Sequence, residues 1–138
     1  MRNRAGNERL AKIPLFQQLS AKQLADIDAL VTTIDVAAGR ELIRQGEPGR
    51  EFIIVVEGDA EVRRDGDVVA VRGPGTFFGE TSLLLDRPRN ATVVAKTAMP
   101  LEVIARQDFR RLLEEFPDLY APLLDAAAQR LAELDETH

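Results

Sequence analysis

The interpretation of the whole sequence depends on the stretch FGETSLLLDRPRNATV, from Phe78 to Val93. Gly79 permits a backbone conformation or a close approach that a Cβ atom would block. Residues 80–85 suit a short helical segment, and the first turn of a helix offers unpaired N–H groups to an anion. Arg89 follows Glu80 by nine residues. Its guanidinium can bind two oxygens of a phosphate.

Glu80 has no use as an anion ligand, because a carboxylate repels a phosphate. It suits a neighbouring hydroxyl, such as a ribose 2′-OH, which can donate a hydrogen bond to it. The stretch therefore predicts a site for a sugar phosphate with a free hydroxyl near the phosphate. A second interpretation stays open at this point. Glu80 and Arg89 would then pair with each other across a loop, and Gly79 would only precede an ordinary helical turn.

Composition limits the classes of partner. The chain has 138 residues, of which 45% are hydrophobic and 30% charged, so it can bury the core of one domain. The net charge of −5 describes an acidic surface, which repels nucleic acid and anionic membranes. A pocket on an acidic protein can still be locally positive. We therefore expect no direct binding to nucleic acid or membrane, while the composition is compatible with a small anionic ligand.

The residue types needed for most catalytic or metal chemistry are scarce. Cysteine is absent and the one histidine is His138, which argues against disulfides, thiolate chemistry and zinc sites. No nucleophile–base pair is evident, so the sequence predicts no enzyme, no catalytic or metal-binding residue and no cofactor. The longest apolar run, Phe52 to Val56, is too short to span a membrane, and no signal peptide is evident. We expect a cytoplasmic protein.

The sequence pattern changes twice along the chain, from helical to β-prone and back to helical. Ser20 and Gln23 form a capping-box pattern before a helix. Glycines then separate short β-prone runs, and Asp65-Gly66 is a hairpin signal. A helix over 108–115 ends at Pro117, and a second helix has Pro122 either near its start or at a kink. The β-prone runs are 41–45, 52–58, 60–64, 67–71, 91–96 and 100–104. This pattern predicts an α+β fold: an antiparallel, jelly-roll-like β-roll with flanking N-terminal and C-terminal helices.

The stretch from 78 to 93 also resembles the phosphate-binding cassette of cyclic-nucleotide-binding domains, which occur in protein kinase A regulatory subunits, catabolite activator protein and cyclic-nucleotide-gated channels. IPLFQQLS is similar to their N-terminal helical motif, and AGRELIRQGEPG and FIIVVEGDAEV resemble the first half of their roll. RQDFRRLLEEFP resembles their hinge helix. The resemblance runs from about Leu10 to Leu134. It implies one domain over 1–138: helical segment 8–31, roll 32–105 with cassette 78–93, and hinge and lid helices 106–135.

The resemblance also implies roles for individual residues. Glu80 would accept the ribose 2′-OH and Arg89 would bind the cyclic phosphate. The side-chain amide of Asn90 would bond the phosphate or the base edge. A threonine at this position accompanies cGMP preference in some members, so Asn90 favours cAMP, with cGMP as the alternative. The implied ligand-binding residues are Gly79, Glu80, Thr81, Ser82, Leu83, Arg89, Asn90 and Ala91, and Phe78, Thr92 and Arg130 are further candidates.

One of these residues departs from the family pattern, and another lies on the segment that matches the lid helix. Thr81 occupies a position where many members have Leu or Met, an apolar residue that helps to couple ligand binding to the hinge helix. Arg130 lies on the segment from about Leu119 to Glu133, which matches the lid helix. An arginine on a helix surface is more often a solvated charge, and the sequence alone favours that interpretation of Arg130.

The expected function is that of a regulatory sensor, which binds cAMP and moves its C-terminal helices. Two alternatives are kept. One is the sensor half of a transcription regulator without its DNA-binding part, and the other is a structural β-roll that no longer binds ligand. Beyond the nucleotide, the expected partner is an effector domain or a second copy of the chain, contacted through the C-terminal helix.

Overall fold

The N-terminal part of the chain is helical. A computed structural model describes residues 4–136, with side chains described for 8–132. His138 and the outermost residues of the predicted domain lie outside these bounds. The first elements are α1 (Arg4–Ala11), the 3-10 turn η1 (Pro14–Phe16) and α2 (Ala21–Asp28). The capping box is confirmed: Gln23 N donates to Ser20 Oγ at 3.2 Å, and Ser20 N donates to Gln23 Oε1 at 2.9 Å.

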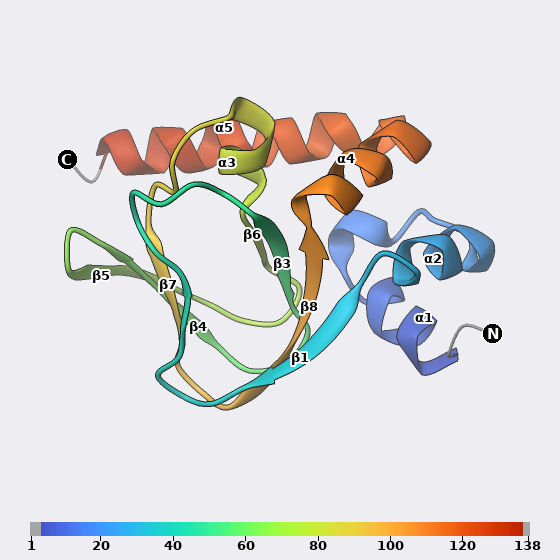
Figure 1. Ribbon diagram of the computed structural model, residues 1–138, viewed down its shortest axis with the longest axis horizontal. Coiled ribbons are helices and arrows are strands. Elements are labelled where there is room, and N and C mark those ends of the chain that lie inside the picture. The colour runs from blue at the N-terminus through green and yellow to red at the C-terminus, as the bar shows by residue number, and fades with distance from the viewer. Residues whose placement is uncertain (1–3, 137–138) are drawn as a thin grey trace.

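Two four-stranded antiparallel sheets form the body of the molecule (Figure 1). One sheet has the strand order β1-β8-β3-β6 and the other β2-β7-β4-β5. The Asp65-Gly66 hairpin is confirmed between β4 and β5, with positive φ at both residues as a type I′ turn requires. The strands are β1 (Thr32–Val36), β2 (Glu41–Ile43), β3 (Glu51–Val55), β4 (Ala60–Arg64), β5 (Asp67–Arg72), β6 (Phe77–Phe78), β7 (Thr92–Ala95) and β8 (Met99–Ala105).

Strand β3 is buried on both faces, and this explains its unbroken apolar sequence. Successive side chains of a strand point to opposite faces. Phe52 and Ile54 pack outward against the helices, in a core that includes residues of α1, α2, α4 and α5. Ile53 and Val55 point into the roll, in a second core shared with β4, β6, β7 and β8. The strand thus separates the helical layer from the interior of the roll.

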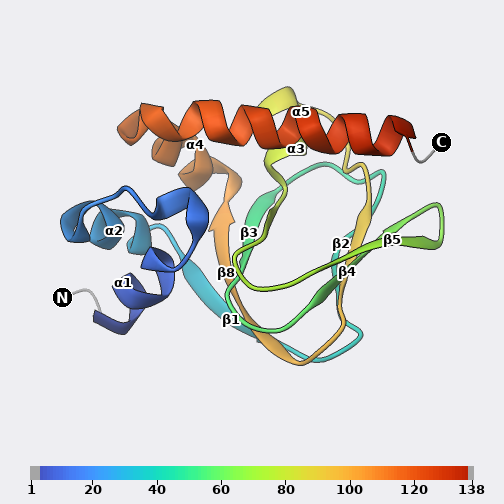
Figure 2. The ribbon, with the colours of Figure 1, turned by 180° about the vertical axis from the view of Figure 1, so that it is seen from behind.

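The C-terminal helices cross one end of the roll. Helix α4 (Arg106–Glu115) is followed by the 3-10 turn η2 (Pro117–Leu119) and by α5 (Tyr120–Glu136). Pro122 lies in the first turn of α5, where a backbone N–H has no partner inside the helix, so it marks the start and causes no kink. Helix α5 runs over the short helix α3 (Glu80–Leu85), as both views of the ribbon show (Figures 1 and 2).

The predicted fold class is confirmed, and three elements were missed. They are α1, β1 and β6. Strand β6 has two residues, and in β1 only Val36 is fully buried, so neither gives an apolar alternation to detect. Within residues 4–136, no helix combines the length and the apolar composition needed to cross a bilayer.

Candidate functional site

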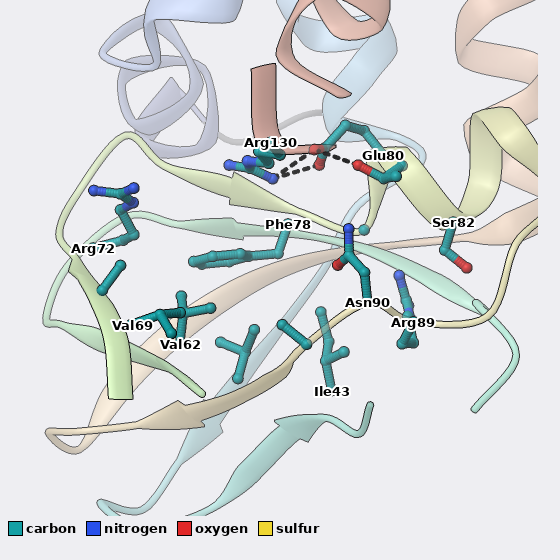
Figure 3. A pocket seen from close by; sticks show the side chains of 15 residues that line it. Ile43, Val62, Val69, Arg72, Phe78, Glu80, Ser82, Arg89, Asn90 and Arg130 are labelled. Atoms are coloured by element: carbon teal, nitrogen blue, oxygen red, sulfur yellow. Dashed lines mark hydrogen bonds and ion pairs between the residues drawn. The ribbon is translucent and has the colours of Figure 1, made fainter. Parts of the chain in front are cut away.

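A pocket lies inside the roll, beneath α5, and most of the predicted site residues line it (Figure 3). Its space is about 780 Å³, including the part open to solvent. The predicted residues in its lining are Phe78, Gly79, Glu80, Thr81, Ser82, Arg89, Asn90, Ala91 and Arg130.

Two predicted residues stand outside the lining. Leu83 is partly buried and packs against the helical core. Thr92 is turned to the neighbouring loop, where its hydroxyl accepts a hydrogen bond from Gln45 N at 3.0 Å. The sequence reasoning in turn missed one wall of the pocket, which is built by Ile43, Val62, Val69, Ala70, Arg72 and Val93. Arg72 lies just after the predicted strand 67–71, and Val93 is the last residue of the predicted cassette. The others were predicted only as parts of strands, because nothing local distinguishes a strand that faces a ligand from one that faces a core.

The chemical character of the lining changes across the pocket. Glu80, Ser82, Arg89 and Asn90 gather on one side (Figure 3). The sticks of Val62, Val69 and Phe78 lie away from that side, with Arg72 beyond them. The charged residues of the lining are three arginines and one carboxylate. The pocket is therefore locally positive on an acidic chain, and it can hold an anionic group and an apolar ring at the same time.

Arg89 is a buried cation with unused hydrogen-bonding capacity. Arg89 is 8% exposed, and its Nη2 donates to Glu51 O at 2.7 Å. Its Nη1 is buried with no hydrogen-bond partner in the described part of the chain. Burial lowers the pKa of the Arg89 guanidinium, and the charges of Glu51 and Glu80 oppose this. The guanidinium nevertheless stays charged at neutral pH, so a donor is left for an anion in the pocket.

Main-chain hydrogen bonds hold Arg89 in place. Its N–H donates to Glu47 O at 2.7 Å, and Gly46 N donates to its carbonyl oxygen at 2.8 Å. On the other side, the Ser82 hydroxyl donates to Arg87 O and closes the loop after α3. The segment around Arg89 is thus tied both to the 46–47 turn and to α3.

Gly79 is required by space as well as by backbone conformation. It has φ of +105° at the start of α3. A Cβ atom there would lie 2.5 Å from Glu51 O and 2.8 Å from Arg89 Nη1. Because glycine has no Cβ atom, the backbone at position 79 can lie close to Glu51 O and Arg89 Nη1, the two atoms that define the position of the guanidinium.

We expect Gly79→Ala to destabilise the chain by at least about 1–3 kcal/mol, the usual cost of a strained backbone position, and to weaken anion binding. Thermal unfolding checks the first effect. Gly39→Ala is the matched control, because Gly39 has a similar φ of +90° but nothing within 4 Å of the added atom. Equal losses in the two variants would show that the contact with Arg89 has no importance.

Glu80 pairs with a residue on the helix above it. The carboxylate is fully buried, and both of its oxygens lie 2.6 Å from Arg130 Nη1. Arg130 Nη2 also donates to Phe77 O, and its guanidinium lies 5.1 Å from the Phe77 ring centroid and 5.3 Å from that of Phe78. Such cation–π contacts add to the attraction.

Two sequence-based interpretations are thereby corrected. Arg130 is not a solvated charge: its side chain is 27% exposed and its head group is held by Glu80 and Phe77. The pairing of Glu80 with Arg89 is also wrong for the described residues, since Glu80 takes Arg130 and Arg89 takes Glu51 O. The physical reason is the position of α5, which brings a cation to Glu80 from 50 residues away.

No group of three or more His, Cys, Asp or Glu side chains in the described chain is placed to hold a metal ion. The pocket offers other groups to a ligand. It holds one free guanidinium donor, one buried carboxylate and an apolar wall.

Comparison with known proteins gives a consistent result. A family model described as the cyclic nucleotide-binding domain matches residues 33–116. The chain is 36% identical over 121 residues to a cyclic nucleotide-gated potassium channel of Mesorhizobium japonicum, covering 88% of this chain and 34% of the channel. It is 40% identical over 113 residues to a cAMP-dependent protein kinase regulatory subunit of Mycosarcoma maydis, covering 75% of this chain and 22% of the subunit.

A solved structure agrees with these matches. The catabolite activator protein of Thermus thermophilus superposes with a TM-score of 0.78 at 29% identity, covering 90% of this chain and 61% of that one. The chain spans about a third or less of the length of the channel and the kinase subunit named above. What it shares with them is therefore one portion of a larger protein.

Proposed function

The chain belongs to the cyclic nucleotide-binding domain family, and on that premise we propose that its pocket binds cAMP and that binding shifts helix α5. The observation that carries the proposal is the buried Arg89 guanidinium with its unpartnered Nη1. A cyclic phosphate carries a single negative charge, which would compensate the buried cation. It also presents oxygens for charge-assisted hydrogen bonds.

The remaining groups of the ligand fit the two parts of the pocket. The ribose 2′-OH is placed at Glu80, whose carboxylate faces the same side of the pocket as Arg89. The base is placed along the wall that includes Val62, Val69 and Phe78. Asn90 in place of threonine supports adenine rather than guanine. So does the name of the kinase relative, which is cAMP-dependent.

The movement of α5 follows from the burial of Glu80. In this structure Arg130 covers the carboxylate, which has no exposed surface. For a ribose hydroxyl to reach that carboxylate, Arg130 has to shift, and with it the part of α5 that carries it. Ligand binding and the position of α5 are then coupled, because each changes the free energy of the other. In a channel, a kinase regulatory subunit or a transcription regulator, the same displacement would be passed on to the effector part of the protein.

Calorimetric titration with cAMP, cGMP and 5′-AMP tests the proposal. We expect cAMP to bind most tightly. We expect 5′-AMP to bind much more weakly, because its phosphate carries more charge and a different shape beside Glu80. At a concentration one hundred times its Kd, cAMP should raise the free energy of unfolding by about 2.7 kcal/mol.

The possible outcomes are distinct. If cAMP gives neither heat nor a change in melting temperature, the proposal fails, and if cGMP gives none either, the chain is a structural β-roll. If cGMP binds more tightly than cAMP, the choice of base is wrong while the site for the phosphate stands.

A further inference from the structure

Thr81 makes a hydrogen bond that a Leu or Met at the same position would not make. Thr81 is 6% exposed and lines the pocket as the second residue of α3. Its hydroxyl Oγ1 donates to Glu80 Oε1 at 3.2 Å. The buried carboxylate therefore has a neighbour on its own helix, in addition to Arg130 from α5.

The contacts of Glu80 leave little room for another donor. An ionised carboxylate offers about four acceptor positions, two on each oxygen. Arg130 Nη1 occupies one position on Oε1 and one on Oε2, at 2.6 Å each. Thr81 occupies the second position on Oε1. When Arg130 shifts to admit the ribose, it frees one position on each oxygen. Oε1 then still accepts from Thr81, while Oε2 has no donor among the contacts of the described chain.

The two donors do not act alike on the orientation of the carboxylate. The terminal torsion of a glutamate is soft, with two equivalent wells. Arg130 presents one nitrogen equally to both oxygens, so it does not distinguish them. Thr81 bonds to one oxygen only. Because Thr81 is the next residue along α3, this hydrogen bond fixes the plane of the carboxylate relative to that helix.

We propose that Thr81 is a positioning residue that directs the 2′-hydroxyl of the bound nucleotide to Oε2 of Glu80. The inference rests on the proposed function, since it concerns how the same site recognises ribose. Without the threonine hydroxyl, a second acceptor position opens on Oε1 and the carboxylate turns more freely. The ribose hydroxyl then meets a less ordered acceptor and gains less from it.

The preference for a ribonucleotide over its 2′-deoxy analogue measures this gain directly. We expect Thr81→Val, which removes the hydroxyl and keeps the shape, to lower the ratio of cAMP affinity to 2′-deoxy-cAMP affinity. The expected fall is about two- to tenfold, the factor that one ordinary hydrogen bond is worth. A ratio is used because general damage to the pocket affects both ligands and cancels. Thr81→Ser keeps a hydroxyl and should restore the wild-type ratio.

Two further variants complete the calorimetric series. Thr97→Val also removes a threonine hydroxyl, one that accepts a hydrogen bond from Asp59 N at 3.2 Å and lies outside the pocket lining, so its ratio should equal that of the wild type. Thr81→Ala serves if the valine variant folds poorly, and it should show the same lowered ratio. Melting curves confirm that each variant is folded.

Each possible result either supports or overturns the proposal. A lowered ratio in the valine or alanine variant, restored by serine, supports the proposal. If the wild type prefers cAMP to its deoxy analogue and the valine variant keeps or raises that preference, Thr81 has no positioning role, while the proposed function stands. If the wild type binds cAMP without any preference for the ribose hydroxyl, the inference is also overturned. If the wild type does not bind cAMP at all, the proposed function itself fails.

Discussion

Arg89→Leu is expected to weaken cAMP binding by roughly a hundredfold or more. The variant removes the two N–H groups of Nη1, which have no partner in the described chain and can each donate a charge-assisted hydrogen bond to the cyclic phosphate. Each such bond is worth about 1.5–3 kcal/mol, and a tenfold loss of affinity needs about 1.4 kcal/mol. The other two arginines of the lining do not take its place: Arg130 is engaged by Glu80 and Phe77, and Arg72 lies at the opposite side of the pocket (Figure 3). Calorimetric titration of the purified variant measures the loss.

The same variant separates a role in binding from a role in folding. Arg89 also donates to Glu51 O, so its removal should cost about 1–3 kcal/mol of stability. Arg87→Leu is the matched control, because Arg87 is an exposed arginine two residues earlier in the same loop. It should leave both stability and affinity nearly unchanged. A large loss of stability in Arg89→Leu together with unchanged cAMP affinity would exclude Arg89 as the phosphate ligand.

Arg130→Met is expected to lower the free energy of unfolding of the ligand-free chain by about 3–5 kcal/mol. The reason is the asymmetry of the pair. Glu80 has no exposed surface, so the loss of Arg130 leaves a buried carboxylate without its cation. Glu80→Gln should cost less, because the Arg130 side chain is 27% exposed and can turn its charge toward water. Denaturant titration of both variants measures the difference.

A second arginine on the C-terminal helices provides the control. Arg111 on α4 is 62% exposed and lies 3.7 Å from Asp108, so Arg111→Met should change stability by no more than about 1 kcal/mol. If Arg130→Met is as stable as the wild type, the contact between α5 and Glu80 is not populated in the free chain. The coupling of α5 to the ribose site would then lose its basis.

The sequence predicted the parts of the site that are local. Gly79, Glu80 and Arg89 lie within one stretch of the chain, and their chemistry follows from their types and spacing. The start of α3 at Glu80 and the positive φ of Gly79 were implied by the same residues. A short stretch with a fixed backbone can be interpreted without knowing the rest of the fold.

The partner of Glu80 could not be predicted in this way. Arg130 is 50 residues from Glu80, and the pattern of α5 shows only which side of the helix is apolar. An arginine near the edge of an apolar face looks the same whether it reaches water or a carboxylate. The wall formed by Val62, Val69 and Ala70 was missed for a related reason, because it depends on which face of the hairpin β4–β5 closes the roll.

An NMR titration of the ¹⁵N-labelled chain with cAMP tests whether a cyclic nucleotide occupies the pocket between Arg89 and Glu80. We expect the side-chain Nε–H signal of Arg89 and the amide signals of Gly79, Asn90 and Ala91 to move together and to saturate at one equivalent. The amide of Gly39, which is not part of the pocket lining, should stay in place. An unchanged spectrum at saturating cAMP, or changes that spare Arg89 and Gly79, would show that no cyclic nucleotide is bound between Arg89 and Glu80.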